Sequence, residues 1–94
     1  MTVKIGDYEF DSVSYDSRGD ILVLSMGDGL REGVADGDTP EGHAWFYPDD
    51  ESDEVIGLML LGVKGQIHTA GGIYVTLPSG ERVHATEAEE AVRS

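Results

Sequence analysis

The histidines are the residues of this chain with the most versatile chemistry, and they are far apart. There are three, His43, His68 and His84, and there is no cysteine. No two are three or four residues apart, so none forms the local pair that binds a metal from one face of a helix. If His43 and His84 lay on paired strands, they could form a site with an aspartate or a glutamate. A small metal-dependent or carboxylate-based enzyme that uses these two histidines is therefore the alternative function.

Catalysis by a nucleophile has less support. The serines occur in no G-x-S-x-G pattern, and the chain has no thiol. The glycine-rich Gly27-Asp28-Gly29 precedes no predicted helix and carries negative charge, so it does not suit a phosphate. A sheet of 94 residues also has little volume for a pocket. We therefore predict a protein that is not an enzyme, with no catalytic residue, no metal and no cofactor.

Carboxylates dominate the charge of the chain. Nineteen Asp and Glu residues against six Lys and Arg residues give a net charge of −13. Such a field repels phosphate groups, so we expect no binding to nucleic acid or to an anionic membrane, and a basic protein or a cation as partner. High solubility or a salt-adapted source would explain the same charge. The acids of residues 36–41 and 49–54 could bind Ca²⁺ weakly, although neither loop has the spacing of a specific calcium loop.

Length and composition predict one domain. A chain of 94 residues suffices for a single modest core, and thirteen glycines argue against long helices. The N-terminus has no apolar segment of signal-peptide length. The longest apolar run, residues 55–63, is less than half of the roughly 20 residues that a membrane helix needs. We therefore expect a single domain over residues 1–94, located in the cytoplasm.

The elements that must position these side chains begin with residues 12–26. Val13 and Tyr15 alternate with polar residues, Ser17-Arg18-Gly19-Asp20 supplies a turn, and Ile21-Leu22-Val23-Leu24 follows without a polar break. This pattern predicts a β-hairpin whose second strand is apolar on both faces. Such a strand belongs in the centre of a sheet that is covered above and below.

A smaller hairpin precedes this one. A two-residue Gly-Asp turn would pair Ile5 with Tyr8 and Val3 with Phe10, all on one face. The apolar residues then change from even to odd positions, which requires a bulge or a bend at residues 11–12. The alternative is one long bent strand without the first turn.

The middle of the chain changes from glycine-rich to aromatic. Residues 27–42 are acidic and rich in glycine, and we expect a mobile loop with a short edge strand near residues 30–35. Trp45, Phe46 and Tyr47 follow as a dense aromatic strand. Adjacent residues on a strand point to opposite faces, so both faces receive a ring. Rings in a small sheet usually belong to its core and otherwise mark an interface, so these three are candidate interface residues.

The second half of the chain predicts another apolar strand, another hairpin and a short helix. Residues 55–63 are again apolar on both faces and are the expected neighbour of residues 21–24, and their glycines favour a strand over a buried helix. Residues 64–72 are left without an assigned element. Residues 73–85 read as a hairpin around a Pro-Ser-Gly turn, and residues 86–94 as a short helix that starts with the T-x-x-E pattern of a capping box.

The hairpin at residues 12–26 resembles a known family. Tyr15-Asp16, Asp20, Leu22 and Leu24 have the spacing that opens the domain-of-unknown-function family 2283, a group of short bacterial and archaeal β proteins. The resemblance covers residues 13–61, and it implies a small antiparallel sheet with no established activity. Because members look like partners of small toxins, it also implies an antitoxin-like role. The segments that resemble the second strand pair of the family are Phe46-Tyr47-Pro48-Asp49-Asp50 and Val55-Ile56-Gly57-Leu58.

Asp16 and Asp20 are predicted to be structural. An aspartate at a strand end accepts backbone N–H groups and fixes a turn. The whole pattern predicts a mainly β domain, a small antiparallel sheet of hairpins or a meander with a short C-terminal helix. One short helix cannot cover both faces of such a sheet, so we expect a homo-oligomer. Self-association would use the apolar strands or the edge at Trp45, Phe46 and Tyr47, and the acidic loops would face a basic protein.

Overall fold

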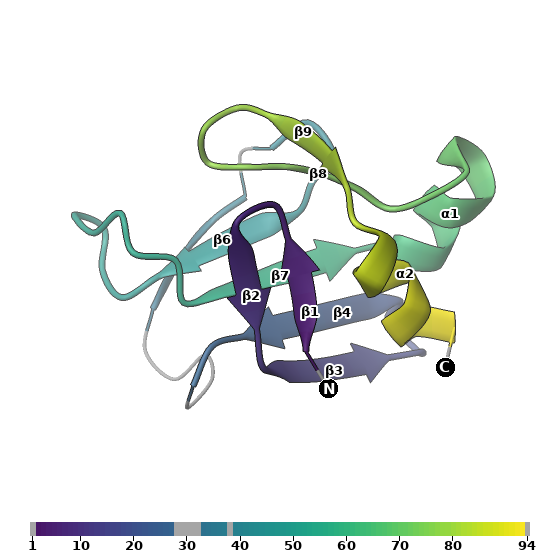
Figure 1. Ribbon diagram of the computed structural model, residues 1–94, viewed down its shortest axis with the longest axis horizontal. Coiled ribbons are helices and arrows are strands. Elements are labelled where there is room, and N and C mark those ends of the chain that lie inside the picture. The colour runs from purple at the N-terminus through teal and green to yellow at the C-terminus, as the bar shows by residue number, and fades with distance from the viewer. Residues whose placement is uncertain (1, 28–32, 38, 94) are drawn as a thin grey trace.

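The described residues form three antiparallel sheets and two short helices (Figure 1). The computed structural model describes residues 2–27, 33–37 and 39–93. The predicted fold class, mainly β with a short C-terminal helix, is confirmed. The elements are β1 (Val3–Ile5), β2 (Tyr8–Phe10), β3 (Ser12–Asp16), β4 (Ile21–Ser25), β5 (Val34–Asp36), β6 (Ala44–Tyr47), β7 (Gly57–Leu61), α1 (Val63–Ala70), β8 (Tyr74–Thr76), β9 (Arg82–His84) and α2 (Thr86–Arg93).

The main sheet has five strands in the order β3-β4-β7-β6-β5. Strands β3 and β4 form the predicted hairpin, with Tyr15 paired to Leu22 and Val13 to Leu24. Strand β7 lies beside β4, as expected from its two-faced apolar run, and pairs Leu60 with Leu22. Strand β5 is an edge strand that overlaps the short one expected near residues 30–35, whereas residues 28–32 and 38 of the expected loop lie outside the described residues.

Two small hairpins complete the strands. In β1 and β2, Val3 pairs with Phe10 and Ile5 with Tyr8, so the predicted register is confirmed. The chain bends at Asp11 and enters a different sheet at β3, which resolves the change of parity. Strands β8 and β9 form the other hairpin.

Only one side of the main sheet faces the core of the described structure. The hairpin β1–β2, helix α2 and strands β8 and β9 lie over that side (Figure 1), here called the covered face. Leu22, Leu24, Leu58 and Leu60 project from it and are fully buried, because alternate residues of a strand share a face. Cover on both sides was predicted from the sequence, and the described elements supply it on one.

The opposite side, here called the open face, is also apolar. The pairing register places alternate residues of β4, β6 and β7 on it. These side chains are half-buried or exposed, and none of them packs against the core cluster. The residues that define the open face are Ile21, Val23, Ala44, Phe46, Met59 and Leu61.

Helix α1 occupies most of the segment left unassigned from the sequence. Gly62 ends the apolar run in a left-handed conformation with φ of 65°, and Gly71 ends the helix with φ of 81°. Glycine adopts such angles without the steric cost that a Cβ atom brings. Val63 is buried and Ile67 packs against the core, so two apolar contacts hold a helix that is too short to be stable alone.

No helix in the described part of the chain is long and apolar enough to cross a membrane.

Candidate functional site

Asp20 joins the central hairpin to helix α1. Its carboxylate accepts the N–H groups of Lys64, at 3.0 and 3.1 Å, and of Gly65, at 3.3 Å, and it also accepts the Tyr15 hydroxyl at 2.8 Å. Its carbonyl oxygen accepts the N–H groups of Gly62 and Val63. The free amides that begin α1 are thus satisfied by one residue more than forty positions earlier in the chain. Desolvation raises the pKa of Asp20, but these hydrogen bonds outweigh it and hold that pKa below its usual value.

Asp16 has a simpler position. Its Oδ1 accepts the Arg18 N–H at 3.0 Å within the turn of the hairpin. The side chain is exposed, and its hydrogen bond reaches only two residues along the chain. Both aspartates of the family-like signature therefore bind backbone amides, one within its own turn and one across the fold.

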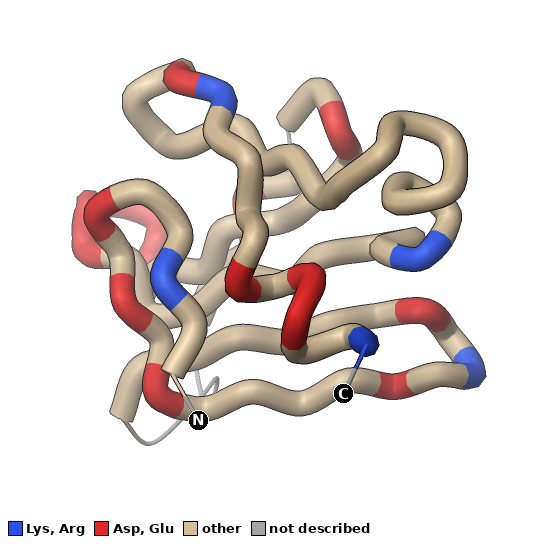
Figure 2. The backbone as a smooth tube through the Cα atoms, turned by 45° about the vertical axis from the view of Figure 1, so that its right-hand side comes forward, with Lys and Arg blue, Asp and Glu red and all other residues tan. Residues whose placement is uncertain are grey.

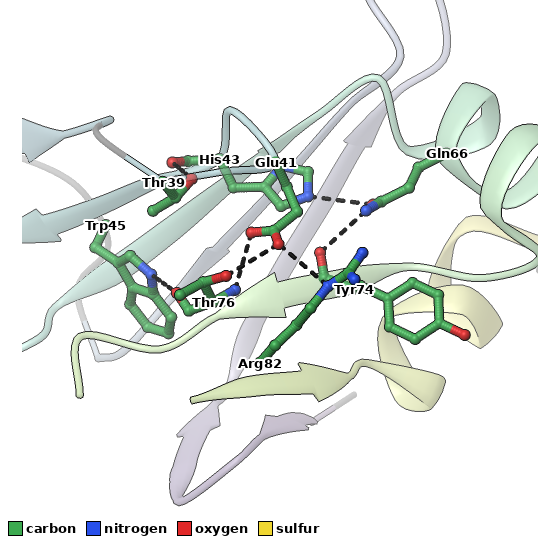
Figure 3. A network of polar contacts seen from close by, with 8 residues as sticks. All are labelled: Thr39, Glu41, His43, Trp45, Gln66, Tyr74, Thr76 and Arg82. Atoms are coloured by element: carbon green, nitrogen blue, oxygen red, sulfur yellow. Dashed lines mark hydrogen bonds and ion pairs between the residues drawn. The ribbon is translucent and has the colours of Figure 1, made fainter. Parts of the chain in front are cut away.

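His43 is buried and uses both ring nitrogens. Its Nδ1 accepts the Leu61 N–H at 3.0 Å, so Nε2 carries the proton and donates to Oε1 of Gln66 at 3.2 Å. The Gln66 amide in turn donates to the Tyr74 carbonyl at 3.2 Å (Figure 3). Burial lowers the pKa of His43 and outweighs the hydrogen bond to Gln66, which raises it. This neutral imidazole fastens β6, β7, α1 and β8 together and has no free lone pair for a metal.

A second network lies next to it (Figure 3). The Glu41 carboxylate accepts the Thr76 N–H at 3.1 Å and the Thr76 hydroxyl at 2.9 Å, and it pairs with the Arg82 Nε at 3.3 Å. The Trp45 indole donates to the Thr76 carbonyl at 2.9 Å. The Glu41 side chain is only 6% exposed, and a buried charge is costly unless it is paired. These three donors supply the pairing. These bonds attach the β8–β9 hairpin to the main sheet.

His84 pairs with a carboxylate from helix α2. Its Nε2 lies 3.0 Å from Oε1 of Glu89, and its ring stacks on Tyr74 at a centroid distance of 4.8 Å. The same oxygen of Glu89 accepts the Ile73 N–H at 2.9 Å. Desolvation raises the pKa of Glu89, but the bonds from His84 and Ile73 dominate and lower it. Glu89 is the glutamate of the T-x-x-E pattern, and its side chain binds Ile73, just before β8, and His84, at the end of β9.

The alternative enzyme site required His43 and His84 to lie on paired strands, and they do not. His43 precedes β6, which pairs with β5 and β7, whereas His84 ends β9, which pairs with β8. No group of three His, Asp or Glu side chains with metal-binding geometry occurs within residues 2–27, 33–37 and 39–93. His68 lies on α1 and is exposed.

The three aromatic candidates for an interface point in different directions. Trp45 is 2% exposed and lies in the core, in ring contact with Tyr8 at 5.2 Å and Phe10 at 6.5 Å. Phe46 is on the open face, and Tyr47 is on the same side of the sheet as Trp45, where it is partly buried against the core cluster. Trp45 is therefore shielded from a partner, while Phe46 and Tyr47 belong to two separate surfaces.

The surface at Tyr47 is hollowed into a groove of about 610 Å³, here called the acidic groove. Four segments build it: the start of β2, the edge strand β5, the turn after β6, and the turn between β8 and β9. Four aspartates and two tyrosines line it, and no lysine or arginine is among the described residues that line it. The lining residues are Tyr8, Val34, Ala35, Asp36, Tyr47, Asp49, Asp50, Ser52, Asp53, Pro78 and Ser79.

The described lining of the acidic groove places carboxylates beside the Tyr47 ring. Burial raises the pKa of Tyr47, and the nearby charges of Asp36 and Asp53 raise it further. The rim turn is ordered by its own side chains, since Asp49 Oδ1 accepts the Glu51 N–H and Ser52 Oγ accepts the Glu54 N–H, both at 3.0 Å. A negative rim beside an aromatic ring suits a cationic side chain.

Acidic positions also occur elsewhere, on the hairpins and on α2 (Figure 2). The sequence pointed to Tyr47 and to residues 49–54, but it did not reveal that Tyr8, Asp36 and Pro78 converge on them. The predicted pairing of Ile5 with Tyr8 was the one local signal, because it places Tyr8 directly after the turn, at the start of β2. The rest depends on contacts between distant segments.

Comparisons with protein-family models, with curated proteins and with solved structures give no match for this chain.

Proposed function

We propose that this chain is a non-enzymatic protein-interaction module that holds a basic segment of a partner protein in the acidic groove. The observation that carries the proposal is the described lining of the groove, in which four aspartates and two tyrosines occur without a lysine or an arginine. Its volume of about 610 Å³ lies within the range of roughly 300–1,000 Å³ that is usual for ligand sites. An arginine side chain is the best fit, because its planar cation binds carboxylates in pairs and stacks on aromatic rings.

The affinity expected from this geometry is moderate. Each exposed carboxylate contributes about 0.2–1 kcal/mol to an ion pair, and salt screens it. The net charge of −13 adds a long-range attraction that speeds the encounter with a basic partner. Four such pairs contribute at most about 4 kcal/mol, so the expected dissociation constant at moderate ionic strength is on the order of a millimolar, with tighter binding at low salt.

A small basic toxin would be a partner of this kind. The antitoxin-like role implied by the resemblance to family 2283 fits the proposal, as does the cytoplasmic location expected from the sequence. The histidines favour the non-enzymatic reading, because His43 is occupied on both nitrogens and His84 is held by Glu89. A catalogue of the neighbouring genes would identify a candidate partner.

A labelled peptide rich in arginine tests the proposal by fluorescence anisotropy. The groove variant is Asp50→Asn with Asp53→Asn, which leaves the turn-forming Asp49 intact. The matched control is Glu87→Gln with Glu90→Gln on α2, which removes the same two negative charges away from the groove. We expect the groove variant to bind the peptide at least tenfold more weakly and the control less than twofold.

A second peptide, with citrulline in place of arginine, has nearly the same shape without the charge. It should not bind at concentrations where the arginine peptide saturates. Equal weakening in both double variants would mean that the peptide senses net charge alone, and the groove would then lose its role. The proposal would also fail if the arginine peptide does not bind wild-type protein at low salt.

A further inference from the structure

The open face of the main sheet is a second surface that the proposed function does not use. Its six residues are apolar, and pairing across β4, β7 and β6 brings them side by side. Leu61 is 41% exposed, and the other five are partly exposed. The covered face, in contrast, buries its leucines completely. No described helix or strand packs on the open face (Figure 1).

The distribution of charge indicates what kind of molecule could cover this face. Within the described strands of the sheet, Asp16 at the end of edge strand β3 is the one charged side chain that the register places on the open face. The chain as a whole carries −13. From the described strands of the open face, a basic partner would gain an ion pair with Asp16 alone. Two copies of this chain repel each other elsewhere, and here Asp16 at one edge is the one carboxylate that each described sheet brings to the contact.

We infer that a second copy of this chain packs on the open face, so that two main sheets form a sandwich across a two-fold axis. Sheets that pack face to face lie about 10 Å apart and interdigitate their side chains. Large and small residues already alternate on this face, since Phe46 pairs with Gly57 and Met59 with Ala44. A two-fold partner presents the same pattern, so its large residues can fill the space above the small ones.

The size of the face sets the strength of this dimer. The five described strands lie about 4.8 Å apart and have three to five residues each, so the face measures at most roughly 24 by 17 Å. Two such faces bury on the order of 800 Å², which is below the roughly 1,200–2,000 Å² of stable interfaces. The dimer should therefore be reversible, with a dissociation constant in the micromolar range. Salt should strengthen it, because screening weakens the repulsion between the two acidic copies.

Sedimentation equilibrium tests the inference from about 1 µM to 1 mM protein at low and high salt. Leu61→Glu places a charge on the open face, and Val34→Glu is its matched control, because both residues are 41% exposed and Val34 lines the groove. We expect Leu61→Glu to weaken the dimer at least tenfold and Val34→Glu less than twofold. A wild-type protein that is monomeric at 1 mM in both salts overturns the inference, as does equal weakening by both variants.

Spin labels test which face is used. The chain has no cysteine, so Met59→Cys on the open face and Ser79→Cys on the opposite side can be labelled singly. Because the open face is only about 24 Å wide, labels on Met59→Cys of two copies should lie within about 30 Å of each other. Labels on Ser79→Cys should be farther apart, since the molecule is 23 Å across in its shortest dimension. A dimer with the reverse order of distances uses another surface and overturns the inference.

Discussion

Replacing Asp20 should reveal how strongly one side chain couples the central hairpin to helix α1. This residue has φ of 56°, which is the left-handed region, and its carboxylate and carbonyl together bind four amides and one hydroxyl. A series of three substitutions separates these contributions. Asp20→Asn keeps an acceptor and tolerates the backbone angle, Asp20→Gly keeps only the backbone angle, and Asp20→Ala keeps neither.

The magnitudes follow from the contacts that each variant loses. Loss of the cap on α1 costs about 1 kcal/mol and loss of the Tyr15 hydroxyl bond about another 1 kcal/mol, so we expect about 2 kcal/mol for Asp20→Gly. Asp20→Ala adds about 1 kcal/mol for the left-handed backbone and reaches about 3 kcal/mol. Asp20→Asn should cost about 1 kcal/mol or less. In a domain of this size, each kcal/mol corresponds to about 4–8 °C in melting temperature.

Urea and thermal denaturation followed by circular dichroism measure these differences. Asp16→Ala is the matched control from the same turn, because Asp16 is exposed and binds a single local amide. It should cost about 0.5 kcal/mol. The reasoning is refuted if Asp20→Ala stays within 0.5 kcal/mol of the wild type, or if Asp20→Asn is as unstable as Asp20→Ala.

Three further outcomes are expected. The melting temperature should rise between about 20 mM and 1 M sodium chloride, because screening relieves the repulsion of a chain with net charge −13, and a flat or falling curve would mean that the carboxylates are already compensated. His43 has a lowered pKa in the folded state, so its contribution to stability is present above about pH 6.5 and is lost as the pH falls towards that lowered pKa. Urea titrations from pH 5 to 8 should therefore show a smaller slope of unfolding free energy against pH for His43→Asn than for the wild type. An unchanged slope would contradict the burial of a neutral ring. Gly65→Ala should stabilise α1 by about 0.5–1 kcal/mol because a methyl group there meets open space, whereas Gly72→Ala should destabilise the protein because a methyl group would collide with Glu89 and His84; a melting experiment in which both variants shift the same way would be inconsistent with this packing.

Much of the strand structure could be predicted from the sequence because its signals are local. Alternation and a Gly-Asp turn are sufficient to define the pairs Val3–Phe10 and Ile5–Tyr8. The two runs around Leu22 and Leu60 are long and branched enough to be recognised as neighbours. Helix α1 was missed because its sequence contains Gly65 and its stabilising contacts come from elsewhere, above all from Asp20.

The candidate surfaces were predictable only in part. The aromatic cluster and the acidic turn were visible in the sequence, but burial decides which ring is free, and Trp45 is buried by β2 and β8. The acidic groove requires four segments to meet, and no spacing rule encodes that. The open face follows from strand parity once the sheet order is known, since Ile21 and Val23 alternate with buried leucines.

The most direct test of the proposed function is a titration of isotope-labelled protein with the arginine-rich peptide, followed by amide chemical shifts. The account predicts saturable shifts concentrated at the amides of groove-lining residues, which are Tyr8, Val34–Asp36, Tyr47, Asp49, Asp50, Ser52, Asp53 and Ser79. It predicts small shifts at Glu87 and Glu90, which are acidic but lie on α2. Shifts spread evenly over all acidic segments, or centred on α2, would contradict a specific site in the acidic groove.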